Sequence, residues 1–126
     1  MSTDEAPQRL HLDYRLAAGV AVVVVTGEVD VATCHLLRAG CLRIVTDEHD
    51  RGLVVNLAGV TFMDSTGLGV LVGVWHRLSA RRGCLALAAP PGQVRRILAT
   101  TGLTKVLPVY DLETDAVQAC RPPGGG

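Results

Sequence analysis

The sequence predicts an α/β fold with a mostly parallel central sheet and about four helices, in the order β-β-α-β-α-β-α-β-α. Two observations support this. Short runs rich in Val, Leu and Ala recur along the chain, and from the second run onward each is followed by a segment with helical spacing of apolar residues. Such alternation favours parallel strands joined by right-handed crossovers. No helix separates the first two strands, so the first can run antiparallel.

Each element has its own local signal. Leu10, Leu12, Tyr14 and Leu16 alternate with polar residues, which indicates a half-buried strand over 10–16. The apolar, β-branched run at 20–26 predicts a strand buried on both faces, and Asp30 can cap the next helix. The remaining expected elements are a helix at 31–46, a strand at 53–57, a helix from 65 to 81, a strand at 84–88, a helix from 90 to 102, a strand at 106–110 and a helix at 111–120.

Length and composition indicate one folded domain at 10–120, between a flexible N-terminus (1–9) and a disordered Pro/Gly tail (121–126). Basic and acidic residues balance at 12 each and aromatic residues make up 3% of the chain, so neither nucleic acid nor an anionic membrane is an expected partner. The longest apolar run, 16–25, is too short to span a bilayer, and no basic signal segment begins the sequence. We therefore expect a cytoplasmic protein.

The four cysteines, Cys34, Cys41, Cys84 and Cys120, lack C-x-x-C spacing. Free thiols in a reducing cytoplasm are the default expectation, with Cys34 and Cys41 on one core-facing side of a helix. Cys34-His35 alone is too small a cluster to indicate a metal site. No metal and no cofactor are expected.

The segment Asp64-Ser65-Thr66-Gly67 follows a strand and opens a helix. One interpretation is helix capping by Asp64 or Ser65, which stabilises by about 1 kcal/mol. The other is a phosphorylation switch at Ser65, with Thr66 as an alternative acceptor. A phosphate adds about −1.5 to −2 charges. The N–H groups at the start of the helix could partly accommodate it, while Asp64 would make a like-charge cluster with it.

Glycines weaken the helix that follows, since each costs about 0.5–1 kcal/mol relative to alanine. Gly69 and Gly73 share a face with Val70, Val74 and Arg77, away from a core stripe expected at Leu68, Leu71, Val72, Trp75 and Leu78. Either the glycines let the helix pack closely on the sheet, or they form a smooth surface for a protein partner, flanked by arginines.

The stretch FMDSTGLGVL (62–71), preceded by VVNLAGVT (54–61), resembles the phosphorylation-site signature of the anti-sigma factor antagonists, members of the STAS-domain family. VTGEVD (25–30) is similar to that family's G-E-[LV]-D corner, and Thr101-Gly102-Leu103 to its S/T-G-L segment. The resemblance covers residues 10–119 and implies the STAS fold.

The resemblance also implies a function without catalysis. The unphosphorylated antagonist would bind an anti-sigma factor and release the sigma factor. That anti-sigma factor would also be a serine kinase with a histidine-kinase-like ATPase fold, and it would end the complex by phosphorylating Ser65. A PP2C-type phosphatase would restore binding. The expected partner-binding residues are Asp30, Asp64, Ser65, Thr66, Gly67, Gly69, Val70, Gly73, Val74 and Arg77.

Three other classes of function are the alternatives to this one. An enzyme is disfavoured because Ser65 lacks a G-x-S-x-G context and none of the four histidines lies in a recognisable triad context. A nucleotide-binding module is disfavoured because the sequence has neither a P-loop nor G-x-G-x-x-G, although weak nucleotide binding near Asp30 and Ser65 stays open. The alternative within the family is a STAS-domain scaffold or a transporter-associated regulatory subunit. No sensor domain or membrane segment is evident, which favours a free-standing antagonist.

Overall fold

The computed structural model describes residues 9–45 and 52–121. Within them the elements follow the predicted order, with one additional 3₁₀ turn. They are β1 (Leu10–Ala17), β2 (Val20–Val29), α1 (Cys34–Val45), β3 (Gly52–Met63), α2 (Ser65–Ala80), β4 (Cys84–Ala88), α3 (Gly92–Thr100), η2 (Leu103–Lys105), β5 (Val109–Tyr110) and α4 (Glu113–Cys120). The expectations for the N-terminal segment and the Pro/Gly tail fall on residues outside this description, apart from Arg9 and Arg121.

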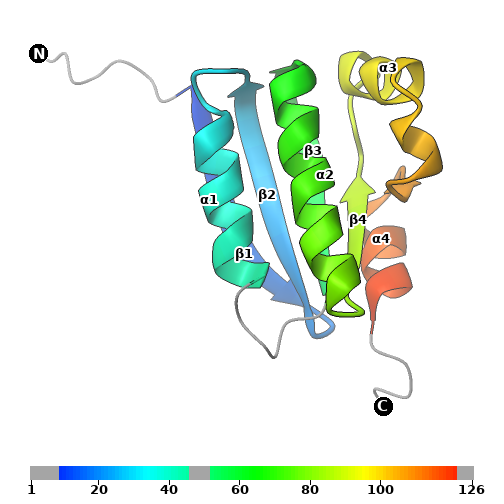
Figure 1. Cartoon of the computed structure of the whole chain (residues 1–126). Helices are drawn as coiled ribbons and strands as arrows, with labels where there is room; N and C mark the ends of the chain where they lie inside the picture. Colours follow the sequence, from blue (N-terminus) through cyan, green and yellow to red (C-terminus); the bar gives the residue numbers. More distant parts are fainter. Residues whose placement is uncertain (1–8, 46–51, 122–126) are drawn as a thin grey trace, which may run out of the picture.

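The strands form one sheet in the order β1-β2-β3-β4-β5. β1 runs antiparallel to β2, and every other neighbouring pair is parallel, as predicted. α1 and α2 lie side by side across one face of the sheet, and the short α3 lies near the ends of β3 and β4 (Figure 1). α4 packs on β2, β3 and β4 from the opposite face, where its side chains meet the second core.

The core has one part on each face of the sheet. The larger part contains Leu37 and Cys41 of α1, Leu71 and Leu78 of α2, and inward side chains of β2 and β3 such as Val23. The smaller part joins Val20, Val22 and Val54 to Ala116 and Val117 of α4. Because β2 and β3 are covered on both faces, their sequences are continuous apolar runs. No helix in the described ranges is both long and apolar enough to cross a membrane.

Several element boundaries differ from the sequence prediction, and those of β3, α1 and β5 have clear structural reasons. β3 continues to Met63, because β2 also extends and pairs with it after a register shift between Val24 and Thr26. α1 begins at Cys34, since a turn from Asp30 to Thr33 precedes it, and residue 46 of the predicted helix lies outside the described residues. β5 holds only two residues, because the chain from Leu103 forms η2 instead of extending.

The cysteine prediction is wrong for one pair. Cys84, which begins β4, and Cys120, which ends α4, form a disulfide with a Cα–Cα distance of 5.4 Å. The pair is 36 residues apart in sequence and meets only because α4 returns across the sheet. Cys34 and Cys41 remain free thiols, with Cys41 fully buried and Cys34 half-buried.

Candidate functional site

The start of α2 has Asp64 as its N-cap. Asp64 has extended backbone angles (φ −111°, ψ −171°), and its carboxylate accepts a hydrogen bond of 2.9 Å from the Thr66 N–H. The same carboxylate oxygen accepts the hydroxyl hydrogen of Thr66. Of the two capping candidates, Asp64 is therefore the one that caps.

Ser65 is the first residue of α2, and its side chain is exposed. Its hydroxyl has no hydrogen-bond partner within residues 9–45 and 52–121, whereas the neighbouring Thr66 hydroxyl is half-buried and bound to Asp64. The two adjacent hydroxyls thus differ in accessibility. Ser65 is the one that an approaching molecule can reach.

Three N–H groups of the first turn of α2 already have acceptors. Thr66 donates to the Asp64 carboxylate, and Gly67 and Leu68 both donate to the Asp64 carbonyl oxygen, at 3.1 and 3.3 Å. An anion on Ser65 would have to displace Asp64 to gain these donors. A charge added at Ser65 consequently stays at the surface of the fold.

The adjacent ends of β2 and β3 bring the two acidic motifs together. Val29 and Met63 are register partners, and the Asp64 N–H donates to the Val29 carbonyl oxygen at 3.1 Å. Asp30 and Asp64 therefore leave the same edge of the sheet from neighbouring strands. The expected proximity of Asp30 to the helix start at Ser65 follows from this parallel pairing.

Asp30 is held in a defined position. Its carboxylate accepts hydrogen bonds from the N–H groups of Ala32 (2.9 Å) and Thr33 (3.2 Å), and it pairs with Arg9, which also reaches Glu28 at 2.9 Å. Desolvation acts to raise the pKa of Asp30, but the Ala32 hydrogen bond and the Arg9 charge outweigh it, so the pKa is lowered. Asp30 is an ionised carboxylate at neutral pH, and it caps the turn that leads into α1 instead of the helix itself, which begins at Cys34.

The G-E-V-D corner has a steric explanation. Gly27 has φ +113°, and a Cβ there would lie 2.0 Å from the Arg9 carbonyl oxygen. The buried Thr33 hydroxyl donates to the Glu28 carbonyl oxygen at 2.7 Å. Only glycine allows β1 and β2 to approach so closely at this point.

Sequence reasoning missed three residues that support the site: Arg9, Thr33 and Gln93. Gln93 in α3 makes hydrogen bonds to both main-chain groups of Met63, at 2.9 and 2.8 Å. These contacts join residues distant in sequence, so no local pattern could have revealed them.

The predicted exposure of the α2 surface needs correction. Val70 and Val74 were expected on an exposed strip, but they are 3% and 1% exposed, because α2 packs against α1 as well as the sheet. Val72 and Trp75, expected in the core stripe, are only half-buried. Gly67 is also buried, and a Cβ there would lie 2.7 Å from Val29 and 2.8 Å from Met63. Close packing is therefore the right interpretation for Gly67.

Gly69 and Gly73 behave differently from Gly67. Both are exposed, and a Cβ at either would have no neighbouring atom within 4 Å. They border a groove of about 150 Å³ between α1 and α2, together with Arg38, Leu42, Val70, Val74 and Arg77. Packing in the described structure does not require glycine at these two positions.

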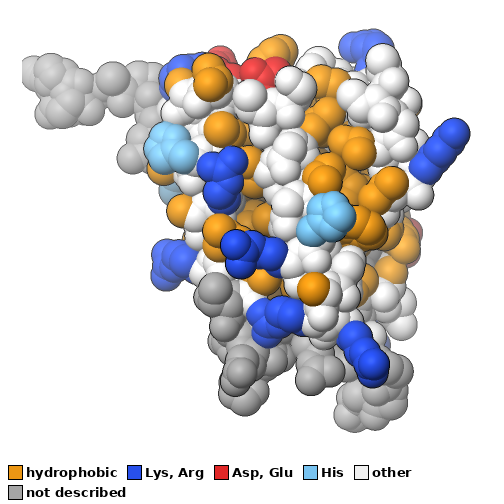
Figure 2. All heavy atoms as spheres, viewed as in Figure 1, with side chains coloured by type: hydrophobic (Ala, Val, Ile, Leu, Met, Phe, Trp, Pro, Cys, Tyr) orange, Lys and Arg blue, Asp and Glu red, His pale blue; other side chains and the backbone are white. Residues whose placement is uncertain are grey.

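The charges of the face formed by α1 and α2 are unevenly distributed. In this view acidic side chains gather at the upper end, where α1 and α2 begin, with basic side chains beside them, and further basic side chains spread over the helices below (Figure 2). Glu28, Asp30 and Asp64 belong to the acidic end, around the exposed Ser65. Among the described residues there is no group of three or more His, Cys, Asp or Glu that could hold a metal ion.

The fold and the site define a small α/β domain with an exposed serine at the start of a helix, beside an acidic edge formed by Glu28, Asp30 and Asp64. A family model described as the STAS domain matches residues 11–116. The chain therefore belongs to the STAS-domain family, as its motifs indicated.

Individual relatives agree with this assignment. The chain is 31% identical over 108 residues to the anti-sigma F factor antagonist of Paenibacillus polymyxa, covering 86% of this chain and 92% of that protein. It is similar to the crystal structure of an anti-sigma factor antagonist from Mycobacterium paratuberculosis, with a TM-score of 0.84, 32% identity, and coverage of 93% of this chain and 98% of that one. A likeness in fold alone extends to Bacillus SpoIIAA in its phosphorylated form, with a TM-score of 0.67, 22% identity, and coverage of 86% and 98%.

Proposed function

We propose that this protein is an anti-sigma factor antagonist that acts by binding and not by catalysis. In its unphosphorylated form it binds an anti-sigma factor and so frees the sigma factor. The observation that carries the proposal is the exposed Ser65 hydroxyl, without a partner in the described structure, at the acidic edge of a STAS domain. Relatives carrying the name anti-sigma factor antagonist support it.

Phosphorylation of Ser65 ends the complex in this proposal. The anti-sigma factor is also a serine kinase with a histidine-kinase-like ATPase fold, and it supplies ATP to the site. The Ser65 oxygen attacks the γ-phosphorus, a new P–O bond forms, ADP leaves and the hydroxyl proton is released. A PP2C-type phosphatase hydrolyses the phosphoserine and restores the binding-competent form.

Charge explains how one phosphate can abolish binding without unfolding the domain. The group adds about −1.5 to −2 charges beside Asp64 and near Asp30. The nearby N–H groups of Thr66, Gly67 and Leu68 are already bound by Asp64, so they do not neutralise it. A partner that approaches this edge would meet like-charge repulsion or would lose contacts to the serine.

Ser65 is preferred over Thr66 as the phosphate acceptor. The Thr66 hydroxyl is half-buried and donates to Asp64, so its phosphorylation would remove part of the helix cap. Modification of Ser65 leaves the cap in place. The proposal therefore assigns the switch to Ser65 alone.

The proposed binding surface joins the acidic edge to the exposed part of α2. It includes Asp30, Asp64, Ser65, Thr66, Gly69, Gly73 and Arg77, while Gly67, Val70 and Val74 support it mainly from beneath. The exposed glycines allow a partner helix or loop to approach the α1–α2 groove closely. The mixed basic and small-residue lining suits a protein surface.

The test compares binding to the cognate anti-sigma factor by calorimetry for wild type, Ser65→Asp and Ser65→Ala. Ser65→Asp should remain folded and bind at least about tenfold more weakly, while Ser65→Ala should bind like wild type. Ser79→Asp is the matched control, because it adds the same charge at an exposed serine of the same helix, far from the cap. Equal affinity of Ser65→Asp and wild type would contradict the switch.

The acceptor is identified separately. Incubation with the kinase and ATP, followed by mass spectrometry, should place one phosphate on Ser65. Ser65→Ala should receive none, whereas Thr66→Val should still be modified at Ser65. Retention of the phosphate in Ser65→Ala would move the switch to Thr66.

A further inference from the structure

β1 is an edge strand, so no other strand of the described sheet pairs with its outer side. The Glu28 N–H donates to the Arg9 carbonyl oxygen at 2.7 Å, and Leu10 pairs with Gly27 in the antiparallel register. The main-chain N–H and C=O groups of the odd-numbered residues of β1 consequently point towards β2. The even-numbered residues Leu10, Leu12, Tyr14 and Leu16 direct their N–H and C=O groups to the open edge.

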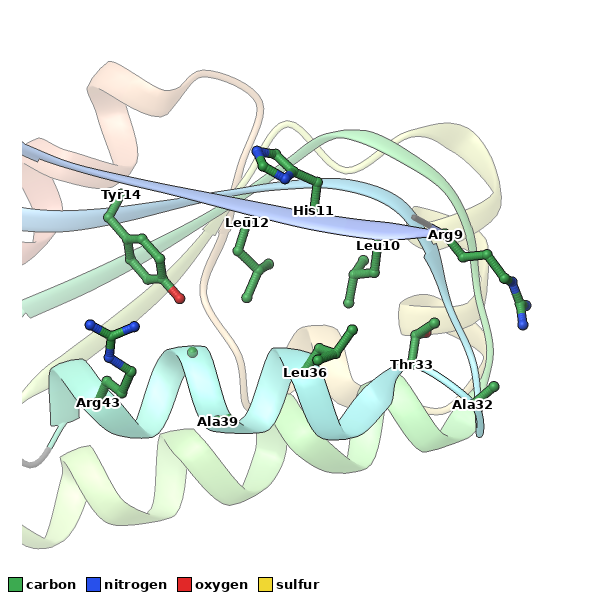
Figure 3. A pocket seen from close by; sticks show the side chains of 11 residues that line it. Arg9, Leu10, His11, Leu12, Tyr14, Ala32, Thr33, Leu36, Ala39 and Arg43 are labelled. Atoms are coloured by element: carbon green, nitrogen blue, oxygen red, sulfur yellow. The ribbon is translucent and has the colours of Figure 1, made fainter. Parts of the chain in front are cut away.

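The side chains of these even-numbered residues form an apolar surface beside α1. Leu10, Leu12 and Tyr14 extend towards α1, where Leu36 extends back towards them, and His11 points to the opposite face of the sheet (Figure 3). They line a groove of about 600 Å³ between β1 and α1. Tyr14 is 45% exposed, Leu16 71% and Leu36 43%. An edge strand with this much exposed apolar surface favours pairing with another strand.

Charged residues on the other face of β1 restrict which pairing is possible. His11, Asp13 and Arg15 follow one another on that face. A second copy, related by a twofold axis, would add its β1 antiparallel to the first. Only even-numbered residues have outward main-chain groups, so each must lie opposite an even-numbered residue of the partner. Near the middle of β1, this condition lets the twofold axis pass through Leu12, Asp13 or Tyr14.

Two of these registers place like charges together. An axis at Leu12 sets Arg9 opposite the partner's Arg15, although it also sets His11 opposite the partner's Asp13. An axis at Asp13 sets this carboxylate opposite the partner's Asp13, and His11 opposite the partner's Arg15. Like charges directly opposite each other are destabilising.

The register centred on Tyr14 is complementary throughout its charged pairs. It sets Asp13 opposite the partner's Arg15 twice, once on each side of the axis. Leu12 then faces the partner's Leu16, and the two Tyr14 rings meet as a cross-strand aromatic pair. Asp13 and Arg15 occupy the positions between main-chain bonded pairs, where opposing side chains approach most closely.

We propose that β1 is a homodimer interface, in which two copies of this chain pair antiparallel about Tyr14 and join their sheets into one. Arg15 already holds Glu113 at 2.5 Å on this face, so it would lie between Glu113 and the partner's Asp13. Ser65 starts α2, over the middle of the sheet, so the dimer presents two separate switch sites.

The test is sedimentation velocity of the full chain over a micromolar to millimolar concentration series. Wild type should show a reversible monomer–dimer equilibrium. Asp13→Arg sets arginine opposite arginine, Arg15→Asp sets aspartate opposite aspartate, and each should raise the dimer Kd at least about tenfold. The double variant Asp13→Arg/Arg15→Asp restores both pairs with exchanged signs, so its Kd should return to within about threefold of wild type.

Folding is checked by circular dichroism and thermal unfolding. Asp13→Arg keeps the test valid if Arg15→Asp weakens the fold through Glu113, because within the described residues the Asp13 carboxylate pairs only with the exposed His11. A wild type that stays monomeric throughout the series overturns the proposal. A dimer that the single variants do not weaken, or that the double variant does not restore, overturns the register centred on Tyr14.

Discussion

The side-chain amide of Gln93 makes two hydrogen bonds to the main chain of Met63. Its Nε2 donates to the Met63 carbonyl oxygen at 2.8 Å, and its Oε1 accepts from the Met63 N–H at 2.9 Å. Met63 immediately precedes the cap residue Asp64, so α3 holds the end of β3 in place. The position of Ser65 therefore depends on a residue 28 positions further along the chain.

Replacing Gln93 by alanine should destabilise the fold by about 1–3 kcal/mol, because both partly buried main-chain groups of Met63 lose their partner. Gln93→Glu is the matched variant, since it keeps an acceptor for the N–H but loses the donor to the carbonyl oxygen at neutral pH. Urea unfolding measures both. A Gln93→Ala protein as stable as wild type would show that these bonds do not support the site.

The three glycines of α2 should respond differently to alanine. Gly67→Ala should destabilise by about 1–3 kcal/mol, because its Cβ would lie 2.7 Å from Val29 and 2.8 Å from Met63. Gly69→Ala and Gly73→Ala should each stabilise by about 0.5–1 kcal/mol, since both have open space and alanine favours the helix. Chemical denaturation of the three variants side by side tests this order.

The same alanine variants separate stability from binding. If Gly69 and Gly73 serve a partner surface, their alanine variants should be more stable yet bind the anti-sigma factor more weakly. Unchanged affinity together with the gain in stability would remove these two glycines from the proposed surface.

Reduction of the Cys84–Cys120 disulfide should lower the free energy of unfolding by about 3–4 kcal/mol on the chain-entropy model, given the 36-residue separation. The double variant Cys84→Ser/Cys120→Ser should show the same loss and no further response to dithiothreitol. Cys34→Ser, which alters a free thiol, should keep the full response. An effect of dithiothreitol on the double variant would mean that the loss of stability has a cause other than this disulfide.

Glu113 should contribute a pH-dependent part of the stability. The hydrogen bond from Arg15 lowers its pKa from the ordinary value of 4.5, and burial opposes this. A lowered folded-state pKa gives stability that is fully present above about pH 4.5 and is lost as the pH falls through the folded-state value. Glu113→Gln should therefore cost about 1 kcal/mol at neutral pH, with the half-exposed Arg15 limiting the gain, and the difference should shrink on acidification.

A double-mutant cycle identifies the source of this dependence. In an Arg15→Gln background, Glu113→Gln should have a smaller effect at pH 7 than in wild type. The remaining part comes from Asn56, whose amide donates to Glu113 at 2.8 Å. An undiminished effect would mean that Arg15 does not stabilise the carboxylate.

The two free thiols should react at different rates. Burial raises the pKa of Cys41 to about 12, and its side chain is fully enclosed, so it should stay unmodified by iodoacetamide at pH 8. Cys34 is half-buried and should be the thiol that reacts in the native protein. Mass spectrometry before and after addition of denaturant, with Cys34→Ser as control, distinguishes the two sites.

Local signals in the sequence determined the order of elements and the helix start at Ser65. β-branched runs specify strands, helical spacing specifies helices, and Asp64 before α2 is a cap because its carboxylate reaches an N–H two residues away. These interactions join near neighbours in the chain, so a single sequence reveals them. The glycine of the G-E-V-D corner has both kinds of cause, because Gly27 has a positive φ and a Cβ there would also meet the main chain of Arg9.

Tertiary structure decided what depends on contacts between distant segments. Periodicity marked one apolar face of α2, but this helix is covered by both the sheet and α1, which buries Val70 and Val74 and leaves Trp75 half-buried. The return of α4 across the sheet brings Cys120 to Cys84. Gln93 reaches Met63 for the same reason, since chain crossovers, which no local pattern encodes, bring these residues together.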